Sequence, residues 1–591
     1  MLRTHTCNEL TSKNVWDEVK LSGWVSNRRD HWGIIFIDLR DRYWLTQIVF
    51  DPADDKTAWA EANDYRSEYV IQVTWKVRRR PEWQENKNLE SGDIEVIVKN
   101  TRLFSKSKTP PFELDEHSTT ANEEIRYKHR YIDLRRKKVL ENVKFRSDFI
   151  TYTRNWFTGK WFLDVQTPLF TVSSPEWARD YLIPSRINPG KFYALPQAPQ
   201  QYKQLLMVGW IDKYFQIAPC FRDEDPRADR HACEFYQIDC EMSFVEREDI
   251  FAVVENFIKD SSKALSDKYV MDNKIHSMSY DEALENYWSD KPDLRFGMKF
   301  VDLTDIFASS EFSVFKNVYD MWWVIKAIKL EGKSMSRKDI DDLTEVAKKE
   351  WARWLAYIIY DENEEWGKKS PILKFMSEKE ISDLEARLQP KNGDMIFFSA
   401  DEFKKAVSIL NKVRLALRDK FELADPKALA LCWVIDFPMF EQDEVSGKID
   451  FAHNPFSMPI WWREAFNTDD LLSMKANQYD LACNWYEILS WSIRNYDVEV
   501  LVKAFETVWR SKQEVIDKFG AMYEAFQYWV PPHGWFAIWM DRFMMILKDE
   551  QNIREVYAFP KSWKAQDLMM NAPAVVDEEQ LKELHISVVE E

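Results

Sequence analysis

Hydrophobic and polar side chains alternate in short runs along the first 108 residues. Five segments show the alternation: "EVKLSGWV", "GIIFIDLR", "LTQIVF", "EYVIQVTWKV" and "GDIEVIVKN". A period of two is typical of strands with one buried face, and turn residues separate the segments. Five such strands predict a small β-barrel of the OB type over residues 1–108, a fold whose open face binds oligonucleotides.

The second of these segments carries a candidate binding face. Ile35, Ile37 and Leu39 share one face of the strand, which leaves Phe36 between polar neighbours on the other. An aromatic ring in that position can stack on a nucleic-acid base, or it can pack under a loop. The spacing alone leaves both interpretations open.

The rest of the chain divides by pattern, and an α+β multidomain fold is expected. Pro110, Pro111 and a polar run predict a hinge over 109–138, with one helix through 123–157. Mixed helix and strand patterns fill 139–293 and resume over 426–560. Between them, amphipathic helices and the strand "GDMIFFSA" predict an inserted α/β domain over 294–425. An acidic C-terminal extension covers 561–591.

Composition narrows the class of protein. A chain of 591 residues exceeds the ~250 to 300 that one core supports, so several domains are expected. No run approaches the ~18 apolar residues of a membrane span, and the first residues lack the apolar core of a signal peptide. We therefore expect a cytoplasmic protein with no membrane partner. Six scattered cysteines without a CxxC pair argue against a zinc knuckle and against a disulfide framework.

The charge distribution gives a mixed indication about nucleic acid. The net charge of −18 speaks against an RNA or DNA partner, because phosphate contacts need Lys and Arg. Three basic clusters can override that sum: "SNRRDHW", "KVRRRPEWQENK" and "RYKHRYIDLRRKK". Charge runs are usually solvated faces, so each cluster alone supports RNA binding only weakly.

Tryptophan and glycine occur in unusual numbers. The chain has 27 Trp and only 13 Gly, whereas Gly is among the commonest residues of globular proteins at about 7%. Many of the Trp residues stand at turns or at junctions between predicted elements. This pattern indicates that tryptophan stands in the place of glycine at many positions.

The segment from Cys220 to Phe244 is the richest in candidate chemistry. Arg222, Arg227 and Arg230 can recognise an anion bidentately, and the acidic residues between them can hold them in place. Neither a P-loop nor a Rossmann fingerprint is present, so side chains must supply anion recognition. Taken alone, the segment could equally be a charged surface hairpin.

At this point the sequence resembles the class II aminoacyl-tRNA synthetases, and within them the bacterial-type aspartyl-tRNA synthetase family. "KWFLDVQTPLF" resembles motif 1, "FRDED" through "EFYQID" motif 2, and "AIWMDRF" motif 3. Further matches are "RYIDLRR", "YALPQAPQQYKQLLM", "YWSDKPDLRF", "WVIDFPMFE", "AHNPFSMP" and "YEILSWSIR". The resemblance runs in order from about residue 2 to 575. It implies an OB-fold anticodon-binding domain over 1–108 and an antiparallel-sheet catalytic domain over 139–293 and 426–560.

The resemblance also bears on the tryptophans. The family has glycine at the positions of Trp177, Trp288, Trp485, Trp535 and Trp539. Glycine is needed where φ is positive or where backbone approaches a ligand, and an indole meets neither need. We hypothesise that the gene is read with UGA as glycine and was translated here with UGA as tryptophan. Trp24, Trp156 and Trp433 fit as authentic.

For the reaction, the resemblance implies activation of L-aspartate by ATP and transfer of the aspartyl group to tRNA(Asp), with tRNA(Asn) left open. Arg222 is expected to bridge the substrate carboxylate and the α-phosphate, and Arg542 to hold the γ-phosphate. Glu224 and Gln237 match further ATP-binding positions. Asp480 and Glu487 match acids that bind Mg²⁺, and hard oxygen ligands suit that ion.

Recognition of aspartate calls for two cations, because a second carboxylate must be bound and the neutral amide of asparagine refused. Lys203 and Arg494 match that pair. Four further positions match the aspartate site: Glu176, Gln200, Asp239 and His453. Alone, His453 is more simply a buried core residue.

The resemblance assigns anticodon contacts to Arg29, Phe36, Gln47 and Glu95, and a homodimer interface to Pro168. Phe36 is then expected to stack a splayed base while the polar residues read base edges. Two alternatives stay open. One is an asparaginyl- or lysyl-specific relative, and the other is a catalytically dead tRNA-binding protein.

Overall fold

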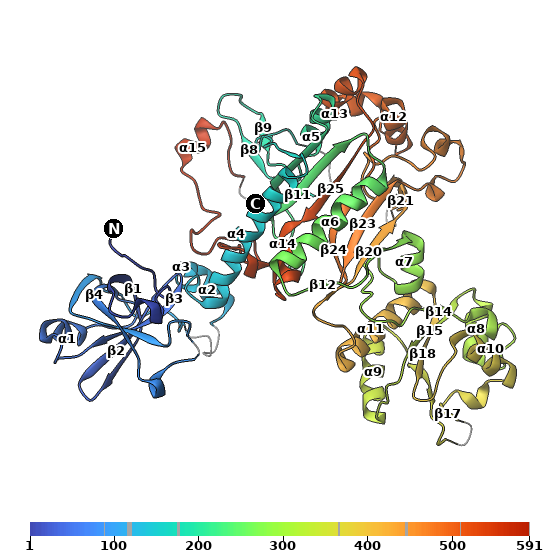
Figure 1. Cartoon of the computed structure of the whole chain (residues 1–591). Helices are drawn as coiled ribbons and strands as arrows, with labels where there is room; N and C mark the ends of the chain where they lie inside the picture. Colours follow the sequence, from blue (N-terminus) through green and yellow to red (C-terminus); the bar gives the residue numbers. More distant parts are fainter. Residues whose placement is uncertain are drawn as a thin grey trace. The chain divides into compact units, whose positions relative to one another are not determined.

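The computed structural model of the chain describes residues 1–87, 89–114, 121–173, 178–364, 367–443, 447–508 and 510–589 (Figure 1). The chain packs as two compact units. One comprises residues 1–144 with 557–574, and the other comprises 145–556 with 575–591. Among the helices of these described ranges, none is long and apolar enough to cross a membrane.

The N-terminal part, blue in Figure 1, is a closed five-stranded barrel with one added strand. Its strands are β1 (Glu18–His31), β2 (Ile34–Asp41), β3 (Trp44–Phe50), β4 (Val70–Arg79), β5 (Ile94–Ile97) and β6 (Asn100–Ser105). They run in the order β1-β2-β3-β5-β4-β6, and pairing of β1 with β4 closes the barrel. Ile35, Ile37 and Leu39 are fully buried, as the alternation predicted. Helix α1 (Lys56–Ala62) begins at Asp55, whose side chain accepts hydrogen bonds from two backbone amides.

The helix predicted through 123–157 is wrong as a single element. The structure divides it into α2 (Glu123–Lys128), α3 (Arg130–Asp133) and α4 (Lys137–Thr158). Because the helix breaks at His129, the buried carboxylate of Asp133 forms ion pairs with Arg126, Arg130 and Arg136. A buried carboxylate requires paired cations. These ion pairs therefore determine the local backbone path, although the periodicity of the sequence favours one continuous helix.

The centre of the second unit is an eight-stranded sheet. Its order is β13 (His276–Ser279), β20 (Leu431–Ile435), β23 (Gln478–Cys483), β24 (Tyr486–Ser492), β25 (His533–Trp539), β11 (Glu234–Ser243), β10 (Lys213–Phe221) and β7 (Leu163–Asp164). Neighbours are antiparallel except at the two ends, where β13 pairs with β20 and β7 with β10 in parallel. The predicted antiparallel platform is therefore confirmed.

Helices and small strands surround this sheet (Figure 1). The helices are α5 (Gln200–Val208), α6 (Arg247–Leu265), α7 (Tyr280–Tyr287), α12 (Val498–Thr507), α13 (Lys512–Ala525) and α14 (Met540–Leu547). The small strands are β8 (Leu182–Pro184), β9 (Phe192–Ala194), β12 (Tyr269–Val270), β19 (Ala428–Leu429), β21 (Phe440–Gln442) and β22 (Ile449–Phe451). Helix α15 (Glu578–Glu583) lies near the C-terminus.

The insert is an α/β domain, as predicted. Its sheet runs β14 (Val301–Asp302), β15 (Val324–Leu330), β18 (Met395–Asp401), β16 (Ala356–Tyr360), β17 (Lys368–Lys369). Residues of α8 (Ser313–Asp320) and α10 (Glu378–Leu388) form one hydrophobic cluster with this sheet. Those of α9 (Arg337–Lys349) and α11 (Phe403–Phe421) form a second.

Within the described ranges, thirteen tryptophans have positive φ. The angles run from 46° to 157°, at Trp16, Trp32, Trp44, Trp161, Trp210, Trp288, Trp322, Trp351, Trp461, Trp462, Trp485, Trp491 and Trp529. A non-glycine residue in the left-handed region costs about 1 to 2 kcal/mol. Thirteen of them would together cost about 13 to 26 kcal/mol, as much as or more than the net stability of about 5 to 15 kcal/mol that an ordinary domain has.

The places of these tryptophans are ones that glycine normally fills. Trp32 and Gly33 form the two-residue turn between β1 and β2, and Asn484 and Trp485 form the one between β23 and β24. Positive φ at both central residues is the hairpin geometry for which Asn-Gly and Gly-Gly are preferred. Trp288 ends helix α7 in the left-handed conformation, the position where helices most often carry glycine.

Candidate active site

One face of the large sheet gathers the residues predicted to bind substrate. The register pairs Asp239 of β11 with Ala537 of β25, and Ala537 pairs in turn with Ser490 of β24. Ser490 stands opposite Asp480 of β23. Because directly paired residues project from the same side of a sheet, these four strands present one continuous surface.

Lys203 and Asp239 form a fully buried ion pair at one end of this face. The Nζ of Lys203, on α5, lies 2.5 Å from an Asp239 carboxylate oxygen and 3.6 Å from Glu241. All three side chains are shielded from solvent. A buried lysine is stable only when anions surround it, and the two strand positions on β11 supply them.

Arg494 completes this buried cluster. Its Nε and Nη2 donate to the two carboxylate oxygens of Glu241 at 3.0 and 3.2 Å, and Nη2 also donates to Gln200 at 3.1 Å. Lys203 and Arg494, the two cations expected for aspartate, therefore share one acid. They lie in the same buried cluster.

Burial and pairing shift the pKa values of this cluster in different directions. Burial raises the pKa of Asp239 to about 6, although Lys203 opposes that shift. Burial also disfavours ionisation of Glu241, but Arg494 and Lys203 hold its pKa below the ordinary value. Glu241 is thus the more firmly charged of the two carboxylates.

Two members of the cluster were not predicted from sequence, Glu241 and His533. The Nε2 of His533 lies 3.7 Å from Glu241, and its Nδ1 is 2.8 Å from the backbone oxygen of Pro531. Burial lowers the pKa of His533 to about 4, so the ring is neutral at pH 7. Glu241 could have been found, because it is the next inward-facing residue after Asp239 on the strand "EFYQIDCEMSF".

Several buried polar atoms in the cluster lack a hydrogen-bond partner within the described ranges. They include Nη1 of Arg494, Oδ2 of Asp239 and Nε2 of Gln237. A buried polar group without a partner costs about 1 to 3 kcal/mol, so such atoms are rare unless a ligand satisfies them. The unpaired donor on Arg494 can bind a carboxylate of an amino acid, and the unpaired acceptor on Asp239 can bind its ammonium group.

The indole of Trp535 lies directly on this cluster. Its ring centroid is 3.4 Å from Nζ of Lys203 and 3.6 Å from the guanidinium carbon of Arg494. Trp491 stacks on it at 3.7 Å, and the buried ring nitrogens of both indoles have no hydrogen-bond partner among the described residues. The ring fills the space in which an amino acid would meet the two cations.

A second indole fills the other end of the face. The ring of Trp539 stacks on Phe235 at 4.8 Å and lies 5.2 Å from the guanidinium carbon of Arg222. The guanidinium carbon of Arg542 is 4.5 Å from the same ring. Arg222 and Arg542 therefore face one space. The space around Trp539 lies beside the one around Trp535 and Arg494, because the two tryptophans are four residues apart on β25 and project from the same side of the sheet.

Asp480 and Glu487 lie together across the β23–β24 hairpin. Ser490 donates to Asp480 at 2.5 Å, and Nζ of Lys291 lies 3.2 Å from Glu487. Burial beside Glu487 raises the pKa of Asp480 well above its ordinary value. Across the described part of the chain, no group of three or more His, Cys, Asp or Glu side chains is placed to hold a metal. Two carboxylates nevertheless fit Mg²⁺, which usually takes one or two from protein and the rest from water and phosphate.

The remaining predicted substrate positions differ in burial. Glu224 is partly exposed with His231 at 4.0 Å, whereas Gln237 is fully buried on the sheet face. Glu176 and Trp177 lie outside the described residues. His453 packs 5.0 Å from the ring of Phe437, and burial lowers its pKa.

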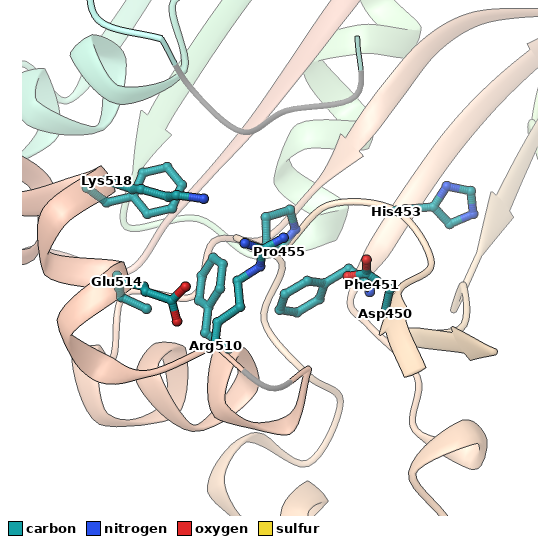
Figure 2. Close-up of a pocket in the computed structure, with 10 residues that line it drawn as sticks. Asp450, Phe451, His453, Pro455, Arg510, Glu514 and Lys518 are labelled. Carbon is teal, nitrogen blue, oxygen red and sulfur yellow. Dashed lines mark hydrogen bonds between the residues drawn. The ribbon is translucent and has the colours of Figure 1, made fainter. Parts of the chain in front are cut away.

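His453 also lines a separate cavity of about 260 Å³. Figure 2 shows Phe451, Pro455 and Arg510 close together in this cavity, with Glu514 and Lys518 on the helix beside them. His453 is drawn apart from that group.

The four predicted anticodon residues meet on one barrel face. Nη2 of Arg29 donates to Asp38 at 2.8 Å and to Gln47 at 3.2 Å, and Gln47 donates to Glu95 at 2.8 Å. Arg78, which the sequence did not single out, donates to Glu95 at 2.8 Å. Phe36 lies on the outer side of β2 next to Arg29 in the β1–β2 register.

Pro168 lies on an exposed apolar stretch. Leu169 is 42% exposed, and Phe170 and Val172 are each 61% exposed. The ring of Phe170 stacks on Tyr193 of β9 at 5.5 Å. An exposed apolar strip of this kind often marks an interface with another protein surface.

Comparison with known sequence families gives two matches. Residues 122–563 match the family described as tRNA synthetases class II (D, K and N). Residues 19–104 match the OB-fold nucleic acid binding domain.

Relatives and solved structures resemble the chain over most of its length. The aspartate--tRNA(Asp/Asn) ligase of Rickettsia bellii (strain OSU 85-389) is 45% identical over 589 residues, 99% of this chain and 97% of its own. That of Chlorobium phaeobacteroides (strain BS1) is 46% identical over 587 residues, covering 99% and 96%. The asparaginyl-tRNA synthetase of Pyrococcus horikoshii complexed with asparaginyl-adenylate has a TM-score of 0.57 at 15% identity, covering 95% and 99%. A putative aspartyl-tRNA synthetase from Leishmania major Friedlin has a TM-score of 0.58 at 18% sequence identity, and the match covers 94% of each chain.

Proposed function

This chain belongs to the class II tRNA synthetases of the D, K and N group, and from that premise we propose that it attaches L-aspartate to tRNA. It is an aminoacyl-tRNA synthetase, a ligase. The observation that carries the choice of aspartate is the buried cluster of Lys203 and Arg494 beside Asp239. The relatives are named for both tRNA(Asp) and tRNA(Asn), which supports charging of both here.

The two cations select aspartate by charge. Asp239 and Gln200 bind the substrate ammonium, and Lys203 and Arg494 receive the side-chain carboxylate. A neutral amide would leave the free Nη1 of Arg494 buried without an anion, which is the costly outcome that excludes asparagine. The predicted roles of Glu176 and His453 belong to the same proposal.

The reaction needs positioning and charge stabilisation from the protein. The α-carboxylate of aspartate attacks the α-phosphate of ATP, the bond to the β-phosphate breaks, and pyrophosphate leaves. A terminal hydroxyl of tRNA then attacks the aspartyl carbonyl, and AMP leaves. Arg222 bridges the carboxylate and α-phosphate, Arg542 holds the γ-phosphate, and Glu224 and Gln237 contact the nucleotide.

Asp480 and Glu487 would hold Mg²⁺ at the phosphate end of the site. When bound, the ion neutralises phosphate charge as the leaving group departs. The proximity of Arg542 to Glu487, 3.9 Å between Nη1 and Oε1, places this acid beside the cation assigned to the γ-phosphate.

The working enzyme carries glycine at positions 535 and 539 and at the thirteen left-handed tryptophan positions. The rings of Trp535 and Trp539 occupy the spaces that aspartate and ATP need, and the positive φ angles supply an independent reason. Decoding of UGA as glycine explains both the filled substrate spaces and the positive φ angles. Peptide mass spectrometry of protein from the native host decides the matter, since tryptophan at 535 and 539 excludes this part of the proposal.

The test of function is ATP–pyrophosphate exchange with aspartate, asparagine and lysine side by side, on protein with glycine at these fifteen positions. Exchange with aspartate alone is expected. Exchange with asparagine or lysine instead would assign the chain to a sister specificity. The indoles that fill the site favour a second candidate for the chain with tryptophan at these positions, a tRNA-binding protein without catalysis. This candidate predicts no exchange with any amino acid when that chain is assayed alongside.

The tRNA partner is read by the barrel face. Arg29, Gln47 and Glu95 form the hydrogen-bonded row that would meet base edges, with Phe36 as the stacking ring. The apolar strip at Pro168 supports a homodimer. All six cysteines are buried and none of them forms a disulfide within the described ranges, which fits a cytoplasmic enzyme.

A further inference from the structure

The inserted domain is connected to the active site through a short segment, residues 289–298. This segment follows α7 and precedes β14, the first strand of the insert. It carries Lys291, whose Nζ lies 3.2 Å from Glu487 and 2.7 Å from Asp290. Lys291 thus reaches the acid pair Asp480 and Glu487 from outside the large sheet.

The insert holds this segment with one arginine. Arg414 lies on α11 and is 2% exposed. Its Nη2 donates to the backbone oxygen of Asp293 at 2.8 Å and of Gly297 at 3.3 Å, and its Nε donates to that of Met298 at 3.2 Å. Its guanidinium also lies 4.1 Å from the ring of Phe296. A guanidinium that binds several carbonyls fixes the path of the backbone that carries them.

The acid of the same segment adds a second attachment. Asp293 is 2% exposed, and its carboxylate accepts two hydrogen bonds from Arg295 and lies 3.6 Å from Arg418 of α11. Residue 293 is therefore bound to α11 through its backbone and its side chain. Lys291, two residues earlier, has little freedom left.

Glu487 is held between two cations. Lys291 lies on one carboxylate oxygen, while Arg542 contacts the backbone oxygen and lies 3.9 Å from the other carboxylate oxygen. Two neighbouring buried carboxylates repel each other, and a fixed cation offsets that repulsion. Both acids can then keep their oxygens directed at the phosphate end of the site.

We propose that the inserted domain serves as an anchor that holds Lys291 against Glu487, so that Lys291 is a positioning residue for the acid pair and Arg414 acts through it. The proposal rests on the function proposed above. It gives the insert a role in amino-acid activation that does not involve contact with tRNA.

The first test is structural and needs no activity. In the Arg414→Met variant, amide hydrogen exchange over residues 289–298 is expected to quicken at least about 10-fold, while the strands of the insert keep their protection. The matched control is Arg387→Met, because Arg387 of α10 also binds a backbone oxygen and a carboxylate in the insert but does not touch the segment. Unchanged exchange in 289–298 for Arg414→Met overturns the proposal.

The second test separates positioning from general damage, in the glycine-containing enzyme. Lys291→Met is expected to lower kcat for ATP–pyrophosphate exchange about 10-fold and to raise the Mg²⁺ concentration at half-maximal rate, with KM for aspartate unchanged. Lys291→Arg should recover part of both losses. If Arg414 acts through Lys291, the double variant with Arg414→Met and Lys291→Met has the same exchange rate as Lys291→Met alone.

The anchor proposal is contradicted if the double variant loses kcat by the product of the two single-variant losses. So does an unaltered Mg²⁺ dependence in Lys291→Met. If the parent enzyme itself shows no exchange, the proposed function fails, and the hydrogen-exchange result still decides the anchor separately.

Discussion

At the scale of single residues, the active site depends on charges that could not be buried one at a time. Lys203, Asp239, Glu241 and Arg494 are all fully buried, and each pairs with at least one of the others. The two cations and two acids balance, so the cluster is neutral before a substrate arrives. Any substitution that removes one member leaves its partner charged and unsatisfied.

His533 gives this cluster a measurable pH dependence. Its pKa in the folded chain is lowered to about 4 from 6.5, so the unfolded state binds a proton first as the pH falls. Stability from the neutral ring is present above pH 6.5 and is lost as the pH falls toward 4, by roughly 3 kcal/mol at most. Urea unfolding at pH 7 and 4.5 should show that loss.

The His533→Gln variant is expected to lose much of this pH dependence. His276 is the control, because it is exposed on β13 and pairs only at the surface with Asp272. His276→Gln should unfold with the same pH dependence as the parent. Equal pH dependence in the parent and His533→Gln contradicts the assignment.

The left-handed tryptophans are the second feature at this scale. Trp485 is at the second position of a two-residue hairpin turn with φ 73°. We expect Trp485→Gly to raise the free energy of unfolding by about 1 to 2 kcal/mol, because the left-handed conformation costs glycine nothing. Trp433 is the control. It is buried, stacks on Phe251 at 3.8 Å and donates to Glu255, so Trp433→Gly should lower stability by more than about 3 kcal/mol.

At the scale of elements, helix α4 and the segments that resemble motifs 2 and 3 meet at one carboxylate. Asp541, at the start of α14, lies 2.5 Å from Nη1 of Arg146 on α4 and accepts from the backbone of Tyr236 on β11 at 2.8 Å. Asp541 is 2% exposed. The helix that carries Arg542 is thereby fixed to the strand that carries Asp239, which keeps the two ends of the substrate face in register.

We expect Asp541→Asn to destabilise the second unit by about 3 to 5 kcal/mol, because it leaves the charge of Arg146 without its buried anion. Chemical unfolding followed by tryptophan fluorescence measures the change. Asp305→Asn breaks an exposed ion pair with Arg387 in the insert and should cost no more than about 1 kcal/mol. Similar losses in the two variants would show that Asp541 does not hold the elements together.

At the scale of the whole molecule, the exposed apolar strip at Leu169, Phe170 and Val172 is the best candidate for an interface between two copies of the chain. Burial of these side chains would remove them from water at about 25 cal/mol per Å². The strip belongs to the segment that resembles motif 1.

Phe170→Glu is expected to weaken dimerisation at least about 100-fold, because it places a charge in the apolar centre of the interface. Sedimentation equilibrium measures it. Phe244 is similarly exposed, at 76%, outside this strip, and Phe244→Glu should leave the oligomeric state unchanged. A parent protein that sediments as a monomer, or a Phe170→Glu variant that still dimerises, rejects this interface.

The sequence predicted the elements better than their contacts. The strands of the barrel follow the alternation, and the fold class and family resemblance are confirmed. The single helix through 123–157 was wrong, because the pull of three arginines on Asp133 is a tertiary effect that periodicity does not record. His533 and Lys291 were missed for a related reason: nothing near them in the chain shows which charges they will meet. Glu241 was missed although the alternation of β11 places it on the same face as Asp239.

The sequence by itself determined the local pattern, the order of the motifs and the identity of the chemical groups. Tertiary structure alone decided which groups share a space. Arg494 and Glu241 are 253 residues apart in the chain, and only the antiparallel register and the loop at 493–495 bring them to 3.0 Å. The physical reason is that alternation and turn preference act between residues that are neighbours in the sequence. A charge, in contrast, can be buried only if the folded sheet brings a distant residue of opposite charge close to it.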